Sequence, residues 1–496
     1  MSNIKFFHIT NYSQKKDAFP YQKEAFEAIK DLDYSAIFHE QGLGKTKIAI
    51  DLMLYWLEKR DIDTVIVVTK KQLVENWRGE FSFHTFITPK VLNQDKKNNF
   101  FVLNSTSRVL LTNFETISSE KERIKLYLKT RSVAVIIDES TKIKNPDSKL
   151  TQDFFELSQL FRIRTIMTGT PVANRPYDIW AQVYFLDHGE SLGTNFKEFK
   201  NDNDLRNDFN EDSEQRDVFE RSVSSIYKKI SRFTVRETKN SNIIHLPQKT
   251  YYSIKCSFEA VQKIMYDQIK NDLEILVQKN DTAILDDEEA SLKRLLRLVQ
   301  VASNPRLIDD LYGSCSGKEA KLEILLKEII NRGEKVIVWS SFIENIDYFT
   351  EKYLQYNPVK IHGKLAIDRR NKAVKKFKED ETCRILFATP QSAKEGLTLT
   401  VANNVIFYDR GFNLDDYLQA QDRIHRISQT KECNIYNLLI ENSIDEWVDL
   451  LLQAKQNAAF LAQGDYQLAK YKSMIDYSYG DLIKDILSRE GNRDDN

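Results

Sequence analysis

The feature that most constrains the fold of this 496-residue chain is a set of short, wholly apolar runs bounded by polar residues. The run Thr64–Thr69 (TVIVVT) shows it best, and similar runs occur at Val109–Thr112, Val133–Ile137 and Thr165–Thr168. A strand that is apolar on both faces must be covered on both faces, which is typical of a parallel sheet flanked by helices. Stretches with helical spacing separate the runs, so we expect an α/β fold in this half.

The same alternation returns in the last third of the chain. The further strand candidates VIVWSSF, VKIHG, RILFAT and NVIFYD begin at Val336, Val359, Arg384 and Asn404. Between the two alternating regions the sequence is highly charged, poor in glycine and helical in its apolar spacing, with one expected strand at Thr250–Ile254. The pattern predicts two α/β domains joined by mostly helical inserts.

Composition limits the possible partners. The chain has 72 Lys and Arg against 73 Asp and Glu, so any nucleic acid has to be bound through local patches. The four cysteines stand far apart, in neither a zinc nor a disulfide spacing. Because there is no apolar run of about 18 residues and no secretory signal, we expect a cytoplasmic protein without membrane contact.

A phosphate-binding loop is predicted at QGLGKT, residues 41–46, which follows the apolar run at Ser35–Phe38 and opens a helix. Backbone N–H groups at a helix N-terminus can cradle phosphates. The Lys45 ammonium would reach the β- and γ-phosphates, and the Thr46 hydroxyl would hold Mg²⁺. His39 stands where the general pattern has Gly, and the alternative is a chance Gly-Lys-Thr in a turn. The predicted nucleotide-binding residues of this loop are Gly42, Gly44, Lys45 and Thr46.

A pair of carboxylates, Asp138-Glu139, follows the apolar run VAVII. A carboxylate at the carboxyl end of a strand suits Mg²⁺ coordination, and the next one can polarise an attacking water molecule. Acidic turns after strands are common, so the pair alone is a weak signal. Together with the phosphate-binding loop it indicates a nucleotide hydrolase.

Two arginines near the end of the chain form a third candidate site. In QAQDRIHRISQ, residues 419–429, Gln419, Arg423 and Arg426 have the spacing i, i+4 and i+7, which is one face of a helix. Two arginines on one face can point at a γ-phosphate held by another domain and neutralise charge in the transition state. The alternative is a solvated basic face.

Taken in order from about Pro20 to about Trp447, these motifs resemble the Swi/Snf family of superfamily-two helicase-like ATPases. The order of the motifs is more specific than any one of them. The motifs are PYQ at 20–22, QGLGKT at 41–46, VVT at 67–69 with Asn76-Trp77, LTNFE at 111–115, DEST at 138–141, TGTP at 168–171, SGK at 316–318, VWS at 338–340, GLTL at 396–399 and QAQDRIHRI at 419–427.

The resemblance implies two RecA-like P-loop motor domains at residues 1–185 and 311–465, with helical inserts at 186–310 and a peripheral tail at 466–496. It implies ATP and Mg²⁺ as cofactors, with Gln22 reading the adenine and Gln419 near the nucleotide. The implied catalytic residues are Lys45, Asp138, Glu139, Arg423 and Arg426, and the implied metal ligands are Thr46 and Asp138. The implied DNA contacts are Thr69, Asn76, Trp77, Thr112, Asn113, Ser340 and Thr398.

The function implied is that of an ATP-dependent translocase on double-stranded or branched DNA. We expect a monomeric, nearly bare motor, used for DNA remodelling, branch migration or fork reversal, or protein displacement. The combination of DES and GLTL leans towards annealing-helicase and prokaryotic or phage-like members. Two alternatives stay open: a strand-separating DNA or RNA helicase, and a DNA-binding switch subunit of a defence or restriction complex.

Overall fold

The computed structural model describes residues 11–172, 174–204, 213–239, 246–279, 288–395, 398–426 and 428–464. The chain forms two compact units, which are described one at a time. The first contains the described parts of Met1–Asp204, Arg221–His245 and Ala462–Asp465, and the second those of Leu205–Glu220 and Leu246–Leu461. The domain boundaries expected near residues 185 and 310 stay predictions, and the expected tail at 466–496 lies outside the described residues.

The first unit is built on a parallel sheet with the strand order β3-β4-β2-β5-β6-β1-β7. Every residue of β2, β4 and β5 is buried, which confirms that these apolar runs are covered on both faces. The strands are β1 (Tyr34–Ile37), β2 (Thr64–Thr69), β3 (Lys90–Val91), β4 (Val109–Asn113), β5 (Val133–Asp138), β6 (Ile163–Met167) and β7 (Thr234–Val235).

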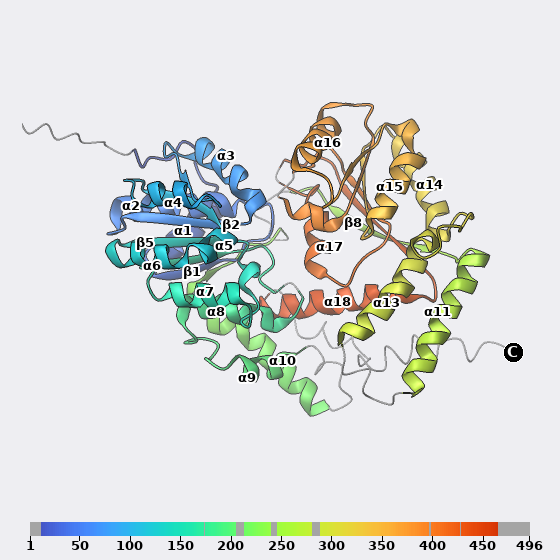
Figure 1. Ribbon diagram of the computed structural model, residues 1–496, viewed down its shortest axis with the longest axis horizontal. Coiled ribbons are helices and arrows are strands. Elements are labelled where there is room, and N and C mark those ends of the chain that lie inside the picture. Colours follow the sequence, from blue (N-terminus) through green and yellow to red (C-terminus); the bar gives the residue numbers. More distant parts are fainter. Residues whose placement is uncertain are drawn as a thin grey trace, which may run out of the picture. The chain divides into compact units, whose positions relative to one another are not determined.

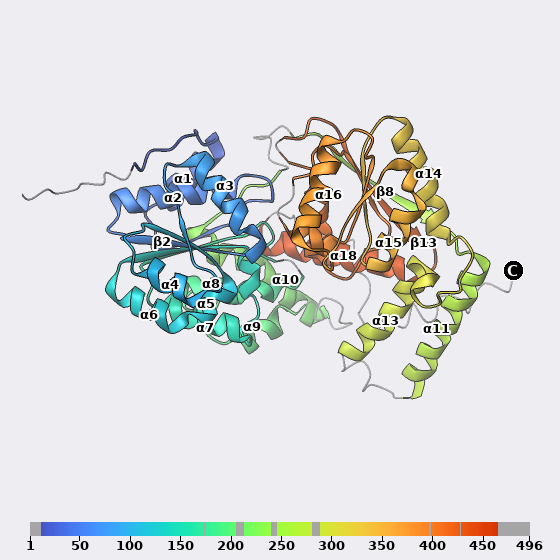
Figure 2. The same ribbon diagram turned by 45° about the horizontal axis from the view of Figure 1, so that its top comes forward.

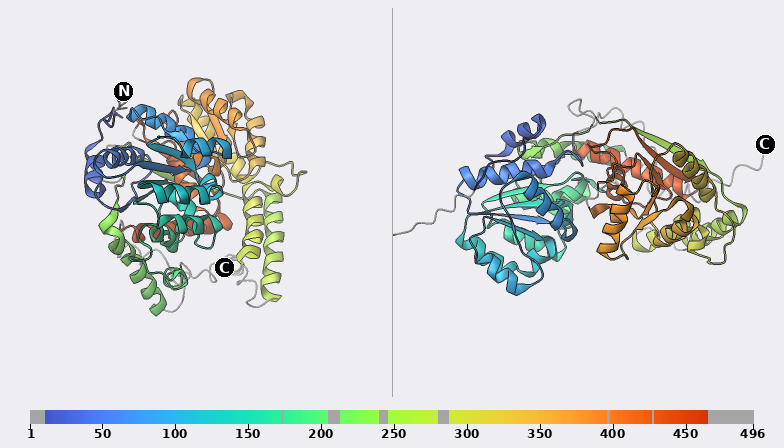
Figure 3. Two further views of the ribbon diagram at one scale, coloured as in Figure 1. Left: turned by 60° about the vertical axis from the view of Figure 1, so that its left-hand side comes forward. Right: turned by 90° about the horizontal axis from the view of Figure 1, so that it is seen from above.

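Helices cover both faces of this sheet (Figure 3). One face carries α1 (Pro20–Ile29), α2 (Lys45–Lys59) and α3 (Val74–His84), which share an apolar core with the strands. The other carries α5 (Phe114–Ser119), α6 (Lys121–Thr130), α7 (Lys149–Ser158) and α8 (Trp180–Asp187). There the ring of Phe154 lies 5.6 Å from that of Phe114 and 6.1 Å from that of Phe185, which joins α5, α7 and α8. The short α4 (Lys96–Leu103) packs beside β3.

The second unit contains a six-stranded parallel sheet in the order β10-β11-β9-β12-β13-β8. Helices α14 and α15 lie on one side of it, and α16 and α18 on the other (Figure 2). The strands are β8 (Lys249–Cys256), β9 (Val336–Trp339), β10 (Val359–Ile361), β11 (Ile385–Ala388), β12 (Asn404–Phe407) and β13 (Cys433–Ile440). The helices are α14 (Gly317–Asn331), α15 (Ile343–Lys352), α16 (Ile367–Glu379), α17 (Leu414–Gln421) and α18 (Ile444–Ala462).

The inserts are mostly helical, as predicted: α9 (Phe196–Asp202), α10 (Ser213–Ile230), α11 (Ala260–Lys279) and α13 (Glu288–Ser303). Helices α11 and α13 pack side by side and extend away from the second sheet (Figure 1). The strand expected at Thr250–Ile254 is present as the longer β8. The inserts also contribute an edge strand to each sheet: β7 pairs with β1, and β8 pairs with β13. The sequence did not indicate these pairings.

Strand β13 is missing from the sequence prediction. Its run CNIYNLLI is interrupted by Asn434 and Asn437, which conceals a strand that is largely buried. The Asn437 amide nitrogen donates to the Tyr417 hydroxyl over 3.1 Å, so the polar group is satisfied inside the unit. In the part of the chain that the structure describes, no helix is both long and apolar enough to cross a membrane.

Candidate functional site

The carboxyl ends of the parallel strands bring the motifs of the first unit to one edge of the sheet. The phosphate-binding loop follows β1, and α2 begins at Lys45. Gly42 has a φ of 88° and Gly44 a φ of 68°, a region that other L-residues rarely adopt. Gly44 is also the N-cap of α2, so the loop leads directly to the free N–H groups of the first helical turn. This is the geometry that binds phosphate.

Gln22, the expected adenine contact, lies against this loop. Its side-chain oxygen accepts from the Phe19 N–H over 2.9 Å and so caps α1, while its nitrogen donates to the Leu43 carbonyl over 3.3 Å. A Cβ on Gly44 would collide with that same nitrogen. Gln22 is therefore positioned to fix the loop, and its contact with a base stays a prediction.

Lys45 is folded back onto the loop. Its Nζ donates to the carbonyls of His39 over 3.0 Å and Glu40 over 3.4 Å. A Cβ built on Gly169, in the TGTP motif, would lie 3.3 Å from this nitrogen, so the two motifs are in close contact. A phosphate carries charge and is a stronger acceptor than either carbonyl, so nucleotide would draw Lys45 away from them. Thr46, the next residue of α2, is half-buried.

The structure explains how the loop tolerates His39 at a usual glycine position. The ring is buried and lies 6.1 Å from that of Tyr21, centre to centre. Burial and the nearby charge of Lys45 lower the pKa of His39 to about 3, so the ring is neutral at ordinary pH. The residue therefore packs inwards and adds no charge to the phosphate site.

Asp138 is the last residue of β5 and is buried. Its Oδ2 accepts from the Trp77 indole over 2.8 Å and from the Thr69 hydroxyl over 3.0 Å. Burial, and next the charge of Glu139, raise the pKa of Asp138 to about 6, while the two donors and Lys45 oppose the rise. The charge of Lys45, at the phosphate-binding loop, is thus among those that act on this carboxyl.

Glu139 has a φ of 56°, in the left-handed region that costs a residue with a side chain about 1–3 kcal/mol. Strained conformations of this kind cluster at functional sites. The conformation turns the chain sharply after β5, and the Glu139 carboxylate forms an ion pair of 3.3 Å with Lys70. Both predicted carboxylates therefore stand at the strand end, beside the phosphate-binding loop.

These side chains fit a magnesium ion. The donors to Asp138 both bind Oδ2, and no described group donates to Oδ1. A carboxylate oxygen and the Thr46 hydroxyl are hard oxygen ligands of the kind that Mg²⁺ prefers. Burial and the charge of Glu139 raise the pKa of Asp138, and a bound divalent cation would oppose that rise.

A supporting residue was missed by the sequence prediction. Gln182 on α8 is completely buried and accepts from the Ser140 hydroxyl over 2.7 Å. Its nitrogen donates to the Pro171 and Asp178 carbonyls, both over 2.9 Å. The side chain thus ties the segment after Glu139 to the TGTP motif. A lone glutamine within a helix carries no sequence signal for such a role.

Most of the residues expected to contact DNA in the first unit have partners inside it. Thr69 and Trp77 bind Asp138, as described above. The Thr112 hydroxyl donates to the Leu92 carbonyl over 3.3 Å, and Asn113 caps α5 by accepting from the Thr116 N–H over 2.9 Å. All four side chains are buried. Asn76 is exposed, and its contact with DNA stays a prediction.

Ser340, the expected contact in the second unit, belongs to a buried polar cluster around Asp409. The Asp409 carboxylate accepts from the Ser340 hydroxyl, from the Ser303 hydroxyl over 2.8 Å and from the Ser341 N–H over 2.6 Å. Asn345 donates to the Ser340 hydroxyl over 3.1 Å. The cluster joins the ends of α13, β9 and β12, so Ser340 supports the fold of this unit.

The arginines do not lie on a helix, which corrects the sequence prediction. Helix α17 ends at Gln421, and Arg423 and Arg426 stand in the following segment, residues 422–426, called here the arginine turn. The helix does not continue because carbonyls of the arginine turn accept hydrogen bonds from other segments. The Arg423 carbonyl accepts from the Leu399 N–H over 2.9 Å, and the Ile424 carbonyl from the Gln429 side chain over 3.0 Å.

The two arginine side chains are held in place by hydrogen bonds that they donate. The Arg423 Nε donates to the Gln419 carbonyl and the Arg426 Nε to the Asp422 carbonyl, both over 3.1 Å. Arg426 also donates to the Thr398 hydroxyl over 2.6 Å, and burial lowers its pKa. Four predicted residues of the second unit, Gln419, Arg423, Arg426 and Thr398, therefore come together, while Gly396, Leu397 and Ile427 lie outside the described residues.

Comparison with known proteins gives two matches to family models. The SNF2-related domain matches residues 21–307, and the helicase conserved C-terminal domain matches residues 320–428. An uncharacterized ATP-dependent helicase of Mycoplasma pneumoniae is 27% identical over 446 residues, which cover 88% of this chain and 41% of that protein. A probable ATP-dependent DNA helicase of Arabidopsis thaliana is 28% identical over 441 residues, covering 84% of this chain and 39% of that protein.

Among solved structures, the SWI2/SNF2 ATPase core of Sulfolobus solfataricus in complex with dsDNA is similar with a TM-score of 0.43 and 23% identity. That alignment covers 94% of this chain and 98% of the other. The chain spans about two fifths of the length of the curated relatives above. The SNF2-related model alone matches more than half of the chain. The chain therefore belongs to the SNF2-related family.

Proposed function

We propose that this chain is an ATP hydrolase that moves along double-stranded DNA. The observation that carries the proposal is that Lys45, Asp138 and Glu139 stand at or after the carboxyl ends of two parallel strands, β1 and β5, of one sheet. A phosphate cradle beside two carboxylates is what hydrolysis of a nucleoside triphosphate requires.

Each residue has a distinct part in this proposal. Lys45 and the N–H groups at the start of α2 hold the phosphates. Asp138 and Thr46 would hold Mg²⁺, which neutralises phosphate charge when it is bound. Glu139 orients the attacking water molecule and accepts its proton. Arg423 and Arg426 stabilise the charge that develops on the transferred phosphate, from the second unit.

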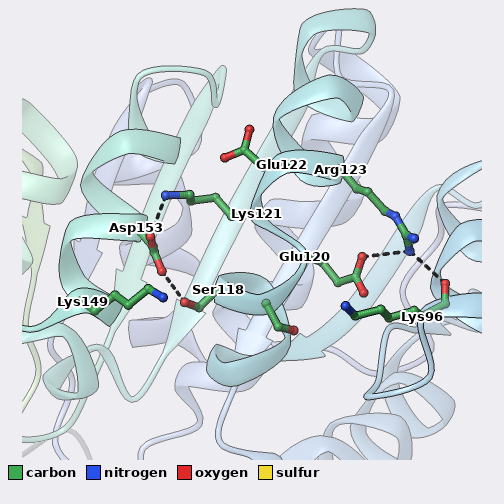
Figure 4. Close-up of a pocket in the computed structure, with 9 residues that line it drawn as sticks. Lys96, Ser118, Glu120, Lys121, Glu122, Arg123, Lys149 and Asp153 are labelled. Carbon is green, nitrogen blue, oxygen red and sulfur yellow. Dashed lines mark hydrogen bonds and ion pairs between the residues drawn. The ribbon is translucent and has the colours of Figure 1, made fainter.

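Support for DNA as the track comes from two sides. Relatives of the chain include proteins named as DNA helicases, such as the one from Arabidopsis thaliana. The surface of the first unit also has a hollow of about 310 Å³ lined by four basic and three acidic side chains, formed where α4, α5, α6 and α7 meet (Figure 4). The basic side chains are Lys96, Lys121, Arg123 and Lys149.

Two of the four cations in this hollow are already neutralised. Lys121 is 2.8 Å from the Asp153 carboxylate, and Arg123 is 3.1 Å from that of Glu120. Lys96 and Lys149 are exposed and form no ion pair with another described residue. They are the two groups in the hollow best able to bind DNA phosphates, which attract cations without regard to sequence.

The deciding experiment compares ATP turnover with double-stranded DNA, branched DNA, single-stranded DNA and RNA at equal nucleotide concentration. Stimulation mainly by the duplex or branched DNA is expected, and stimulation mainly by RNA or single strands would favour a strand-separating helicase. No stimulation by any polymer, with intact ATP binding, would favour a switch subunit of a larger complex.

The salt dependence of DNA binding tests the track separately. The binding constant should fall with a log–log slope of about −0.9 per phosphate contact. The double variant Lys96→Ala/Lys149→Ala should lower that slope by roughly two contacts, whereas a control with Lys59→Ala and Lys327→Ala should not. A salt-independent binding constant would contradict DNA binding through phosphates.

A further inference from the structure

Two described stretches of the chain, one in each unit, contact residues of the proposed function. Residues 234–239, which begin with β7 in the first unit, and residues 246–251, which lead into β8 in the second, are together called here the connector. Each stretch is considered within its own unit.

The first stretch lies along the beginning of the phosphate-binding loop. The Phe38 N–H donates to the Val235 carbonyl and the Glu40 N–H to the Glu237 carbonyl, both over 2.9 Å. The Arg236 guanidinium donates to the Phe38 carbonyl over 2.8 Å. The Glu40 side chain accepts from the Lys239 N–H over 2.8 Å.

These contacts fix the backbone that holds the catalytic lysine. Lys45 donates to the carbonyls of His39 and Glu40, which lie in the stretch 38–40 that the connector contacts. A shift of this stretch would move the resting position of Lys45. Arg236 and the connector backbone thus act on the lysine through the loop.

The second stretch lies against the arginine turn and the last residue of α17. The His425 ring forms a hydrogen bond of 2.9 Å with the Pro247 carbonyl. The Lys249 ammonium is 3.3 Å from the Asp422 carboxylate, and the Tyr251 hydroxyl donates to the Gln421 side-chain oxygen over 2.9 Å. Lys249 and Tyr251 are two residues apart on β8, so they project from the same side of the strand.

These contacts fix the residues to which the arginines are bound. Asp422 is held by Lys249 through its carboxylate and accepts from Arg426 through its carbonyl. Gln421 precedes it and ends the helix that carries Gln419. Loss of the Tyr251 or Lys249 contact would loosen the backbone from which Arg423 and Arg426 project.

We propose that the connector is a positioning element for catalysis, which sets the phosphate-binding loop through Arg236 and the arginine turn through Lys249 and Tyr251. The inference rests on the proposed ATP hydrolysis, and it assigns these two described stretches a role in the reaction. None of these residues touches the reacting atoms; each acts through a neighbour.

The test uses two tyrosines that are adjacent on β8. Tyr251→Phe removes the hydroxyl that binds Gln421 and keeps the ring. Tyr252→Phe is the matched control, because Tyr252 projects from the opposite side of β8 to Tyr251. The Tyr252 ring stacks there on that of Tyr436 at 4.9 Å. Tyr251→Phe should lower DNA-stimulated kcat about fivefold to tenfold, the usual effect of one neutral hydrogen bond, with nucleotide affinity unchanged.

Substitutions at Arg236 and Lys249 test the other contacts. The first should change nucleotide binding, and the second should change kcat in a way that a conservative substitution restores. Arg236→Gln should weaken nucleotide binding about fivefold to tenfold because it loosens the loop. Lys249→Met should lower kcat, and Lys249→Arg should restore most of it, because arginine keeps the charge that Asp422 accepts. Unchanged kcat in both Tyr251→Phe and Lys249→Met would overturn the proposal.

Amide hydrogen exchange decides the question without any turnover. Exchange over residues 419–426 should be faster in Tyr251→Phe than in Tyr252→Phe, and exchange over residues 38–44 faster in Arg236→Gln. A wild-type chain that hydrolyses no ATP would refute the proposed function, and the exchange rates would still test the positioning contacts. Equal exchange in variants and control would refute the connector's role.

Discussion

The two halves of the proposed site are built in different ways. In the first unit, the phosphate-binding loop and the acidic pair follow parallel strands directly, so the ends of β1 and β5 bring them together. In the second unit, the arginines follow the end of a helix and stand in a turn held by side chains from other segments. The first half depends on backbone geometry and the second on a network of hydrogen bonds.

This difference predicts how each half responds to substitution. Backbone geometry set by a sheet survives the loss of one side chain, so a change there should remove chemistry and leave the structure intact. A turn held by side chains should lose position when any holding group is lost. Substitutions in the first unit should therefore give sharp functional effects, and those around the arginine turn should give graded ones.

The largest effect is expected from Lys45→Ala. The substitution removes the positive charge from the phosphate site, and ATP turnover should be abolished. Lys59→Ala, at the far end of the same helix, should have normal turnover. Near-normal turnover in a folded Lys45→Ala protein would show that the loop is not the phosphate site.

The next largest effect is expected from Arg426→Ala. Loss of a group that stabilises transition-state charge costs about 10³–10⁵ in turnover, while ATP binding should weaken much less. Thr398→Val, which removes only the hydroxyl that holds Arg426, should cost far less and so make the graded response visible. If Arg426→Ala and Thr398→Val lose equal turnover, the arginine has only a structural role.

A smaller effect distinguishes the two roles of Trp77. Trp77→Phe keeps an aromatic ring in the core but removes the donor to Asp138, so turnover should fall about tenfold with DNA affinity unchanged. Trp56→Phe is the matched control, because its indole donates to the Lys30 carbonyl on another part of the same unit. If DNA affinity falls in Trp77→Phe but not in Trp56→Phe, the result would support the predicted contact of Trp77 with DNA.

The smallest effect concerns stability and has the opposite sign. The pKa of Asp138 in the folded protein, about 6, lies above its ordinary value of 3.8, so the folded state binds this proton more tightly than the unfolded state. The free energy of unfolding therefore falls as the pH rises from 3.8 through 6, as far as this group is concerned. In the absence of magnesium, Asp138→Asn should remove that loss and raise the free energy of unfolding by up to about 3 kcal/mol at pH 8.

Urea unfolding at pH 5 and pH 8 measures this difference, and the gain should be smaller at pH 5, where much of the wild-type carboxyl is protonated. A variant that is less stable than the wild type at pH 8 would show that the hydrogen bonds from Trp77 and Thr69 outweigh the cost of burying the charge.

The sequence predicted the elements whose signal is local. The runs at β2, β4, β5 and β9 are continuous and apolar, and the structure confirms them as buried strands. The sequence could not reveal β13, because its two asparagines find partners only after folding. Nor could it reveal the end of α17, which depends on hydrogen bonds from Leu399 and Gln429. A motif names the residue types, but distant donors and acceptors decide where a helix stops.

The sequence by itself determined the family, the alternation of strands and helices, and the identity of the phosphate-binding and acidic residues, because each is encoded in a few consecutive positions. Only the tertiary structure decided that Thr69 and Trp77 serve Asp138, that Gln182 ties two motifs together, and that the connector contacts the loop and the arginine turn. These pairings join residues far apart in the chain, and they form only when packing has brought the strand ends and the turn into place.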